Sequence, residues 1–384
     1  MVSRTEKGAL ADWFWTIDRY FLFLFIVLIG IGFMLSFAAS PAVAERLNLD
    51  TFHFVKKHAE FLIPSLIVMI GLSFLTPRQV RRAAMILLIV SLGLMVIALF
   101  FGVEVKGSRR WVSFGPLTIQ PSEFLKPAFV VVSAWLFAER IRQPEIPGYL
   151  FATILYGIVV ALLVAQPDLG QTILTTTVWG SMFFMAGMSW VWIIAMVSAG
   201  ITGLFGAYLV FPHVAGRIDS FLTEDDKSYQ PKIAMEAILN GGWWGQGPGE
   251  GTFKRILPDS HTDFIFSVAA EEFGIVFCMV LVAIFAFIVV RGLTYALRER
   301  SDFNRFAVAG LVMQIGIQSI INIGVNLRLL PAKGMTLPLI SYGGSSMIAI
   351  CVTAGFILAL TRLRPERRAQ ERSLFRAGVS VPAE

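Results

Sequence analysis

Long apolar runs separated by short polar connections make up most of the chain. A helix that crosses a bilayer needs about 20 consecutive apolar residues, and ten segments approach that length. They are residues 20–39, 60–76, 83–102, 123–138, 148–165, 169–187, 190–211, 264–290, 306–327 and 341–361. The pattern predicts an all-α polytopic membrane protein, a bundle of ten transmembrane helices.

The connections between the apolar segments are short, with one exception at about 212–263. We therefore expect one transmembrane domain over residues 20–362 that carries one long outer loop. Residues 1–19 precede it as an N-terminal segment, and residues 363–384 follow it as a tail that we expect to be disordered. The first apolar segment is longer than the usual core of a signal peptide, so we expect an uncleaved helix.

The distribution of basic residues predicts the orientation of the bundle. Ten spans place both termini on one side, where the connections hold 18 Lys and Arg in 76 positions, against 13 in 108 on the other side. Because basic loops are retained in the cytoplasm, both termini should be cytoplasmic. The connections richest in Gly, Pro and unusual polar residues then face outward, on the side opposite to that of a cytoplasmic nucleotide enzyme.

The composition excludes several classes of protein. The 384 residues are 56% hydrophobic and only 15% charged, whereas soluble domains are about a quarter charged, so a water-soluble globule is excluded. Two cysteines inside apolar runs and four scattered histidines favour neither a disulfide scaffold nor a zinc site. The net charge is +6, but no basic run alternates with aromatic residues, so we expect no nucleic-acid partner.

The first polar segment on the outer side is VKGSRRWVSFGPLTIQPSEFLK, residues 105–126. Its cations Lys106, Arg109 and Arg110 suit phosphate oxygens, and the ring of Trp111 suits a sugar or a lipid headgroup. The alternative is that these residues only anchor the chain at the membrane surface.

The same segment continues into the membrane. Pro121 and Ser122 predict the start of a helix, which places Glu123 and Lys126 three positions apart on one face, just inside the bilayer. Ionisable groups at that depth indicate a functional site. A structural ion pair between the two is the alternative.

Asp168 stands at the tip of the next outer connection, AQPDLGQT, residues 165–172. Beside Gly170, it suits a turn residue or the N-cap of the following helix. The spacing alone favours that structural role over a binding site.

The long outer loop has an amphipathic stretch followed by glycines. PKIAMEAIL, residues 231–239, mixes apolar positions with Lys232 and Glu236, which predicts a short helix lying on the bilayer surface. Six glycines between 241 and 251 allow either the close approach of a ligand or a mobile flap, and flexibility is the simpler interpretation.

Asp263 is the last acid before the eighth apolar segment, in ILPDSHTDFIF, residues 256–266. A partly desolvated carboxylate at this boundary is suited to act as a general base. The alternative is that it only interacts with the dipole of the following helix. His261 precedes it by two residues. Glu271 lies about 12 Å further along the helix and about 80° around from Asp263, whereas Glu272 lies about 180° around.

The fourth polar segment is NIGVNLRLLPAKGMTLPLISYGGSS, residues 322–346. Asn322, Asn326 and Arg328 lie at or just beyond the outer end of the ninth apolar segment. The prolines and glycines that follow predict a rigid re-entrant connection. Irregular backbone near membrane depth persists only where it is buried in protein or lines a cavity.

Four motifs in this order identify a family. RRWVSFGPLTIQPSEFLK, QPDLG, LPDSHTDFIFSVAAEEFG and LPAKGMTLPLISYGGSS resemble the SEDS family (shape, elongation, division and sporulation) of polytopic cell-wall glycosyltransferases. The resemblance covers about 20–362. SYQPKIAMEAILNGG and the Lys333-Gly334 pair are more similar to the division branch than to the rod-elongation branch.

The resemblance implies a ten-helix enzyme that polymerises lipid II into glycan strands at the outer face of the bacterial inner membrane. It further implies an active site facing the periplasm, a place at the division septum, and surrounding membrane lipid. The implied partners are a monofunctional class B penicillin-binding transpeptidase and other division proteins. GQGPGEG differs from the family's usual GQGLG at Pro248 and Glu250, which leaves the conformation of that loop open.

The family's essential acid matches Asp263, which the resemblance implies to be the catalytic base of an inverting transfer onto the GlcNAc 4-hydroxyl. Its other sensitive positions match Glu123, Lys126 and Asp168, and Lys57 matches a basic position more loosely. The residues expected to bind or support the substrate are Lys106, Arg109, Arg110, Trp111, Glu123, Lys126, Asp168, His261, Asn326 and Arg328. The sequence identifies no metal ligands and no cofactor, and a divalent cation at the pyrophosphate stays an open alternative.

Two other functions remain at this point. The charges at 123, 126, 168 and 271 would also suit a lipid II flippase, a transporter that moves an anionic headgroup across the bilayer. A scaffold that recruits a transpeptidase would instead make the polar loops dispensable.

Overall fold

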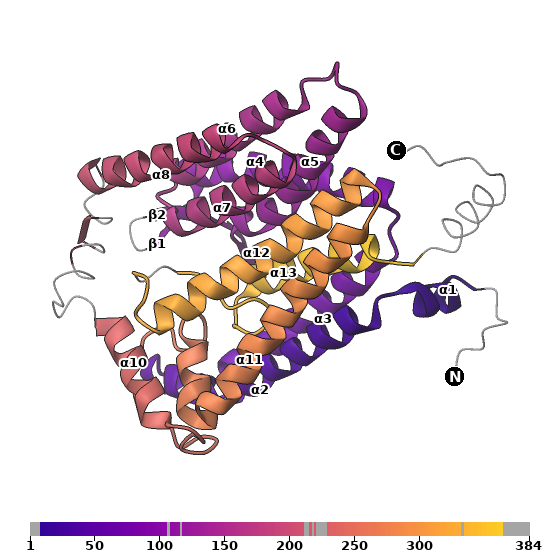
Figure 1. Ribbon diagram of the computed structural model, residues 1–384. Helices are drawn as coiled ribbons and strands as arrows, with labels where there is room; N and C mark the ends of the chain where they lie inside the picture. Colours follow the sequence, from indigo (N-terminus) through magenta and orange to yellow (C-terminus); the bar gives the residue numbers. More distant parts are fainter. Residues whose placement is uncertain are drawn as a thin grey trace.

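The computed structural model describes residues 8–105, 108–115, 117–210, 215–216, 219, 229–331 and 334–363 (Figure 1). Each of the ten apolar segments coincides with a helix in this part of the chain. These helices are α2 (Arg19–Arg46), α3 (His53–Ser73), α4 (Pro77–Phe101), α5 (Pro121–Arg142), α6 (Gly148–Ala165), α7 (Leu169–Met185), α8 (Trp190–Val210), α11 (Ile265–Arg298), α12 (Asp302–Asn326) and α13 (Gly344–Leu360).

The all-α polytopic class is confirmed, whereas the number of spans stays a prediction. Among the described residues, five helices are long and apolar enough to cross a membrane, namely α2, α4, α6, α11 and α12, and α13 is a shorter apolar helix. Large apolar side chains also point outward from these helices, among them Ile86, Ile89 and Phe100 of α4. Such a surface is suited to lipid and would drive aggregation in water.

Shorter elements occupy the ends of the bundle. They are α1 (Ala9–Thr16), α10 (Tyr229–Gly241), the 3-10 turn η2 (Phe253–Arg255) and the strands β1 (Val103–Val105), β2 (Ser108–Phe114) and β3 (Leu117–Ile119). The strands form an antiparallel sheet in the order β1-β2-β3. Figure 1 shows α1 at the end of the bundle opposite to α10 and the sheet. The helix predicted in the long loop is α10, whereas neither α1 nor the sheet was predicted.

The central helix α12 carries polar side chains into the core. In its most apolar window 78% of the residues are buried, against 22% for α6, and it packs on α5, α7, α11 and α13. Gln314, Gln318, Asn322 and Asn326 follow one another at four-residue spacing and are all buried. Residues four apart share one helix face, so α12 presents a ladder of amides to the interior.

α11 is broken at Gly274, where the sequence predicts an uninterrupted apolar span. Gly274 has φ 82° and ψ 173°, which is not helical. At this break the backbone of the glycine-rich stretch replaces the helix's own partners: Ile275 N–H donates to Gly242 O at 2.9 Å, and Gly247 N–H donates to Glu272 O at 3.1 Å. The stretch is therefore bonded to α11, which differs from the mobile flap that its composition favours.

Candidate active site

Asp263 lies in a turn immediately before α11, with its backbone held from two sides. Its N–H donates to Asp259 O at 3.1 Å. Its carbonyl oxygen accepts hydrogen bonds from Asn322 Nδ2 at 2.8 Å and from Asn326 Nδ2 at 3.1 Å. The residue is half-buried. The last turns of α12 thus fix the main chain of Asp263.

The connection between α12 and α13 packs against the same turn. Ser341 Oγ donates to Thr262 O at 2.6 Å, and Tyr342 N–H donates to His261 O at 3.1 Å. A Cβ atom added to Gly334 would lie 3.5 Å from Asp263 Oδ2. The predicted re-entrant segment is therefore buried against the Asp263 turn in its described part, residues 334–343.

His261 sits in an aromatic environment beside Asp263. Its ring lies 4.4 Å from that of Phe54 and 5.5 Å from that of Tyr342, measured between centroids. Burial lowers the pKa of His261 to about 4, so the imidazole is neutral at pH 7. We therefore assign it no positive charge toward an anionic substrate.

Glu123 and Lys126 form the ion pair that their spacing predicts, with side chains 8% and 4% exposed. Glu123 Oε2 accepts from Lys126 Nζ at 2.8 Å and from Ser346 Oγ at 3.1 Å, and Glu123 Oε1 accepts from Gln171 Nε2 at 2.5 Å. Three helices, α5, α7 and α13, meet at this carboxylate.

The buried Asp168 and the partly buried Arg110 form a second ion pair beside it. Asp168 accepts from Gln171 N–H at 3.3 Å and so caps α7, as its turn position predicts. Arg110 Nη1 lies 3.3 Å from Asp168 Oδ2, and the guanidinium also donates to Pro167 O at 2.8 Å and Gln166 O at 3.2 Å. Most of the Arg110 donors are thus used within the protein.

Gln318 joins the ion pairs to the connection beside Asp263. Lys126 Nζ donates to Gln318 Oε1 at 3.1 Å, and Gln318 Nε2 donates to Thr336 O at 3.0 Å. One turn further, Asn322 Nδ2 donates to Met335 O at 2.7 Å. Sequence reasoning missed Gln318. Amides at four-residue spacing in an apolar helix are the signal that would have found it.

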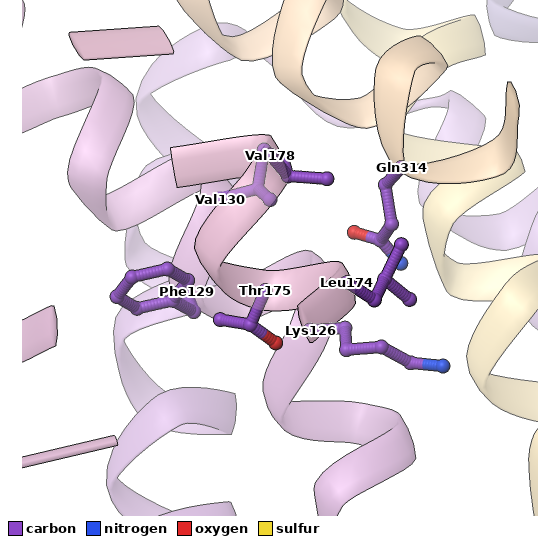
Figure 2. Close-up of a pocket in the computed structure, with 7 residues that line it drawn as sticks. All are labelled: Lys126, Phe129, Val130, Leu174, Thr175, Val178 and Gln314. Atoms are coloured by element: carbon purple, nitrogen blue, oxygen red, sulfur yellow. The ribbon is translucent and has the colours of Figure 1, made fainter. Parts of the chain in front are cut away.

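A small cavity lies below this network, with room for about one water molecule (Figure 2). Lys126, Thr175 and Gln314 are the polar residues among those that line it, and Figure 2 shows their side chains around it. Among the described residues, Thr175 Oγ1 and Gln314 Oε1 have no hydrogen-bond partner. The cavity is too small for a lipid headgroup.

The remaining predicted residues lie in the sheet and just beyond α12, where the structure describes them. Arg109 on β2 is half-exposed and lies 3.4 Å from Glu104. Trp111 on the same strand is partly buried, and Arg328 lies just beyond α12 with φ 57°. Lys106 lies outside the described residues. Within the described ranges, no group of three or more His, Cys, Asp and Glu side chains could hold a metal ion.

Comparisons with known proteins agree over almost the whole chain. The family model described as a cell cycle protein of the FtsW, RodA and SpoVE type matches residues 18–366. A protein of Caulobacter vibrioides named probable peptidoglycan glycosyltransferase FtsW is 47% identical over 365 residues, which are 94% of each chain. A protein of the same name from Tolumonas auensis is 34% identical over 91% of this chain and 93% of its own.

Two solved structures have similar folds. One is described as the structural coordination of polymerization and crosslinking by a peptidoglycan synthase complex. It superposes with a TM-score of 0.75 at 26% identity, over 90% of this chain and 97% of its own. The rod shape determining protein RodA of Thermus thermophilus superposes with a TM-score of 0.67 at 28% identity, over 90% of this chain and 96% of its own.

Proposed function

The chain belongs to the FtsW, RodA and SpoVE family of cell cycle proteins, and we infer from this how its polar centre works. It is a peptidoglycan glycosyltransferase embedded in a membrane, as the names of its relatives and its apolar helices indicate. Its activity is the polymerisation of lipid II into β-1,4-linked glycan strands during cell division. The roles of individual residues, the orientation and the partners are our proposals.

The placement of Asp263 is the observation that carries the proposed mechanism. Its main chain is fixed by Asn322 and Asn326 while the residue stays half-buried at the outer end of the bundle. In the proposed reaction, this carboxylate takes the proton of the acceptor GlcNAc 4-hydroxyl as the hydroxyl oxygen attacks C1 of the donor MurNAc. The bond from C1 to the pyrophosphate oxygen breaks, and the configuration at C1 inverts.

Negative charge then develops on the leaving pyrophosphate, which requires nearby donors. We assign this role to Arg109, to Arg328 and to Lys106, the last of which lies outside the described residues. Lys126 and Arg110 are instead bound to Glu123 and Asp168. These two pairs support the site by holding α5, α7, α12 and α13 together. A divalent cation bound to the pyrophosphate stays an open alternative source of positive charge.

The proposed setting rests on the distribution of basic residues and on the family resemblance. Both termini lie in the cytoplasm of a bacterial cell, and the Asp263 turn faces the periplasm at the septum. Lipid II diffuses to this end within the outer leaflet, so its tail and the apolar helices bring the headgroup to the site in two dimensions. A class B transpeptidase is the proposed partner, and the likeness to a chain of a peptidoglycan synthase complex supports a partner of that kind.

The test uses purified protein in liposomes with lipid II and its transpeptidase, scored separately for glycan polymer and for headgroup translocation. Wild type should make polymer, and Asp263→Asn should make none while inserting normally, because an amide cannot accept the acceptor's proton. Asp259→Asn is the matched control, four residues away, and should keep activity. Polymer from Asp263→Asn would exclude the general base, and translocation without polymer would favour the flippase.

A further inference from the structure

A buried carboxylate outside the proposed reaction centre holds the segment that leads to Asp263. Glu271 on α11 is fully buried, at 0% exposure. Its Oε1 accepts from Thr252 N–H at 2.7 Å, from Phe253 N–H at 2.8 Å and from Asn240 Nδ2 at 3.3 Å. Its Oε2 accepts from Lys254 N–H at 3.1 Å. Three successive backbone groups therefore converge on one side chain.

This arrangement has a clear electrostatic reason. The nearby cation, Lys254, directs its Nζ to Glu272 and to Gly249 O at 3.0 Å. Glu271 is thus stabilised by oriented N–H dipoles, which form a concave nest for an anion. Charge-assisted hydrogen bonds of this kind are directional, so the carboxylate fixes the position of the backbone around it. Gly251 leaves the required space, since a Cβ atom there would lie 2.8 Å from Glu271 Oε2.

The nest is joined to Asp263 by a short, packed stretch of chain. Leu257 N–H donates to Phe253 O at 2.9 Å, which ties the end of η2 to the next turn. The side chain of Leu257 is fully buried in a cluster with Phe264 and Ile233. Residues 252–263 are therefore held at their beginning by Glu271 and at their end by the amides of α12. The hydrogen bond and the buried side chain of Leu257 restrict the chain between these two points.

Both ends of this segment rest on one rigid piece of helix. Phe264 is the N-cap of α11, and Glu271 and Glu272 lie near the end of the part of α11 before the Gly274 break. The segment leaves this half-helix at the nest and returns to it at the turn of Asp263. A displacement at Glu271 must therefore move the main chain that precedes Asp263.

We propose that Glu271 is a positioning residue of the transferase, setting the place of the Asp263 carboxylate through residues 252–263 without touching the substrate. The inference rests on the proposed function of Asp263. Removing the nest should slow the chemical step, because a base displaced by about 1 Å can cost on the order of 100-fold in rate. Binding of lipid II, through the cations of the protein and through the lipid tail, should change little.

The test compares Glu271→Gln with Glu250→Gln. Glutamine keeps the size of the side chain but presents an amide N–H₂ to backbone N–H groups, so part of the nest is lost. The kcat for polymerisation should fall about 10- to 100-fold with the KM for lipid II within about twofold of wild type. Glu250 is exposed in the same loop, and its substitution should leave both constants unchanged.

Hydrogen exchange measures the structural step independently of activity. A peptide covering residues 252–263 should exchange faster in Glu271→Gln and at the wild-type rate in Glu250→Gln. If Glu271→Gln is not recovered folded, Glu271→Asp replaces it in the test. Aspartate keeps the charge but is one methylene shorter, so its carboxylate lies further from the backbone N–H groups. It should show the same fall in kcat with KM retained. Wild-type kcat and protection in Glu271→Gln, or equal loss in kcat and in binding, would overturn the proposal.

Asp263→Asn in the same assay separates this inference from the proposed function. If Asp263→Asn polymerises, the general base is wrong whatever Glu271 does. If Asp263→Asn is inactive while Glu271→Gln behaves like Glu250→Gln, only the positioning role fails.

Discussion

The two members of the buried ion pair are not equally protected against the loss of their partner. Without Lys126, the Glu123 carboxylate keeps hydrogen bonds from Gln171 and Ser346. Without Glu123, the Lys126 ammonium keeps one hydrogen bond among the described residues, to the neutral Gln318 oxygen. A buried charge with few hydrogen-bond partners is more costly than one with several. The Glu123 carboxylate therefore tolerates the loss of Lys126 better than the Lys126 ammonium tolerates the loss of Glu123.

Glu123→Ala should therefore destabilise the protein more than Lys126→Ala. Removing one partner of a buried ion pair lowers the free energy of unfolding by about 3–5 kcal/mol. We expect a loss near that range for Glu123→Ala and a much smaller loss for Lys126→Ala. Thermal unfolding of the purified variants in one detergent measures the difference. Equal losses, or a larger loss in Lys126→Ala, would show that the environment of Glu123 does not stabilise its charge.

Gln318 and Gln314 offer a matched pair one turn apart on the same face of α12. Gln318→Leu removes the acceptor of Lys126 and the donor to Thr336 O. The free energy of unfolding should fall by about 1–3 kcal/mol, and polymerisation should be slower. Gln314→Leu removes an oxygen that has no partner among the described residues, so it should cost less. Unfolding temperature and polymer yield are measured for both, and an equal effect would exclude the bridging role of Gln318.

At the scale of residues, the sequence indicated those contacts that are local. Glu123 and Lys126 are three apart, and Asp168 caps the helix that follows it directly, so short-range geometry predicts both. The bond from Lys126 to Gln318 spans 192 positions, and the nest of Glu271 is formed by main-chain groups 17 to 19 positions away. No periodicity encodes such partners, because they depend on how the helices pack.

The break in α11 is the element that most depends on one residue. Gly274 combines a φ of 82° with backbone atoms of Trp243 and Gly245 so close that no side chain fits. A non-glycine residue would suffer both the left-handed conformation and the collision. The apolar pattern of residues 264–290 hides this break, since it records burial in lipid or protein and not the continuity of the helix.

Gly274→Ala should therefore unfold the junction between α11 and the glycine-rich loop. We expect a loss beyond the roughly 1–3 kcal/mol of backbone strain alone. Gly249→Ala is the control, because Gly249 has a φ of 90° but open space around its Cβ position. Thermal unfolding and hydrogen exchange over residues 241–254 measure both variants. A Gly274→Ala protein as stable as Gly249→Ala would show that the junction rearranges at no cost.

At the scale of the whole molecule, the polar centres gather at one end of an apolar bundle. The ends of α5, α7, α12 and α13, together with β2 and the connection between α12 and α13, contribute the ion pairs and amide bridges described around Asp263 and Lys126. The apolar runs predicted the helices because a bilayer imposes length and composition on each of them. The sheet and α1 were missed because strands as short as Val103–Val105 and a helix of eight residues are set by tertiary contacts.

Orientation is the property of the whole molecule that the proposed mechanism needs most, since the lipid-linked substrates must meet Asp263 in the periplasm. Glu250→Cys and Gln143→Cys place thiols at exposed positions on opposite sides of the predicted topology. In intact spheroplasts, a membrane-impermeant thiol reagent should label Glu250→Cys and leave Gln143→Cys unlabelled until the membrane is permeabilised. The native Cys278 and Cys351 are buried and should not react with the reagent. Labelling of Gln143→Cys alone would show that the Asp263 turn faces the cytoplasm. That result would contradict the proposed polymerisation on the outer face of the membrane.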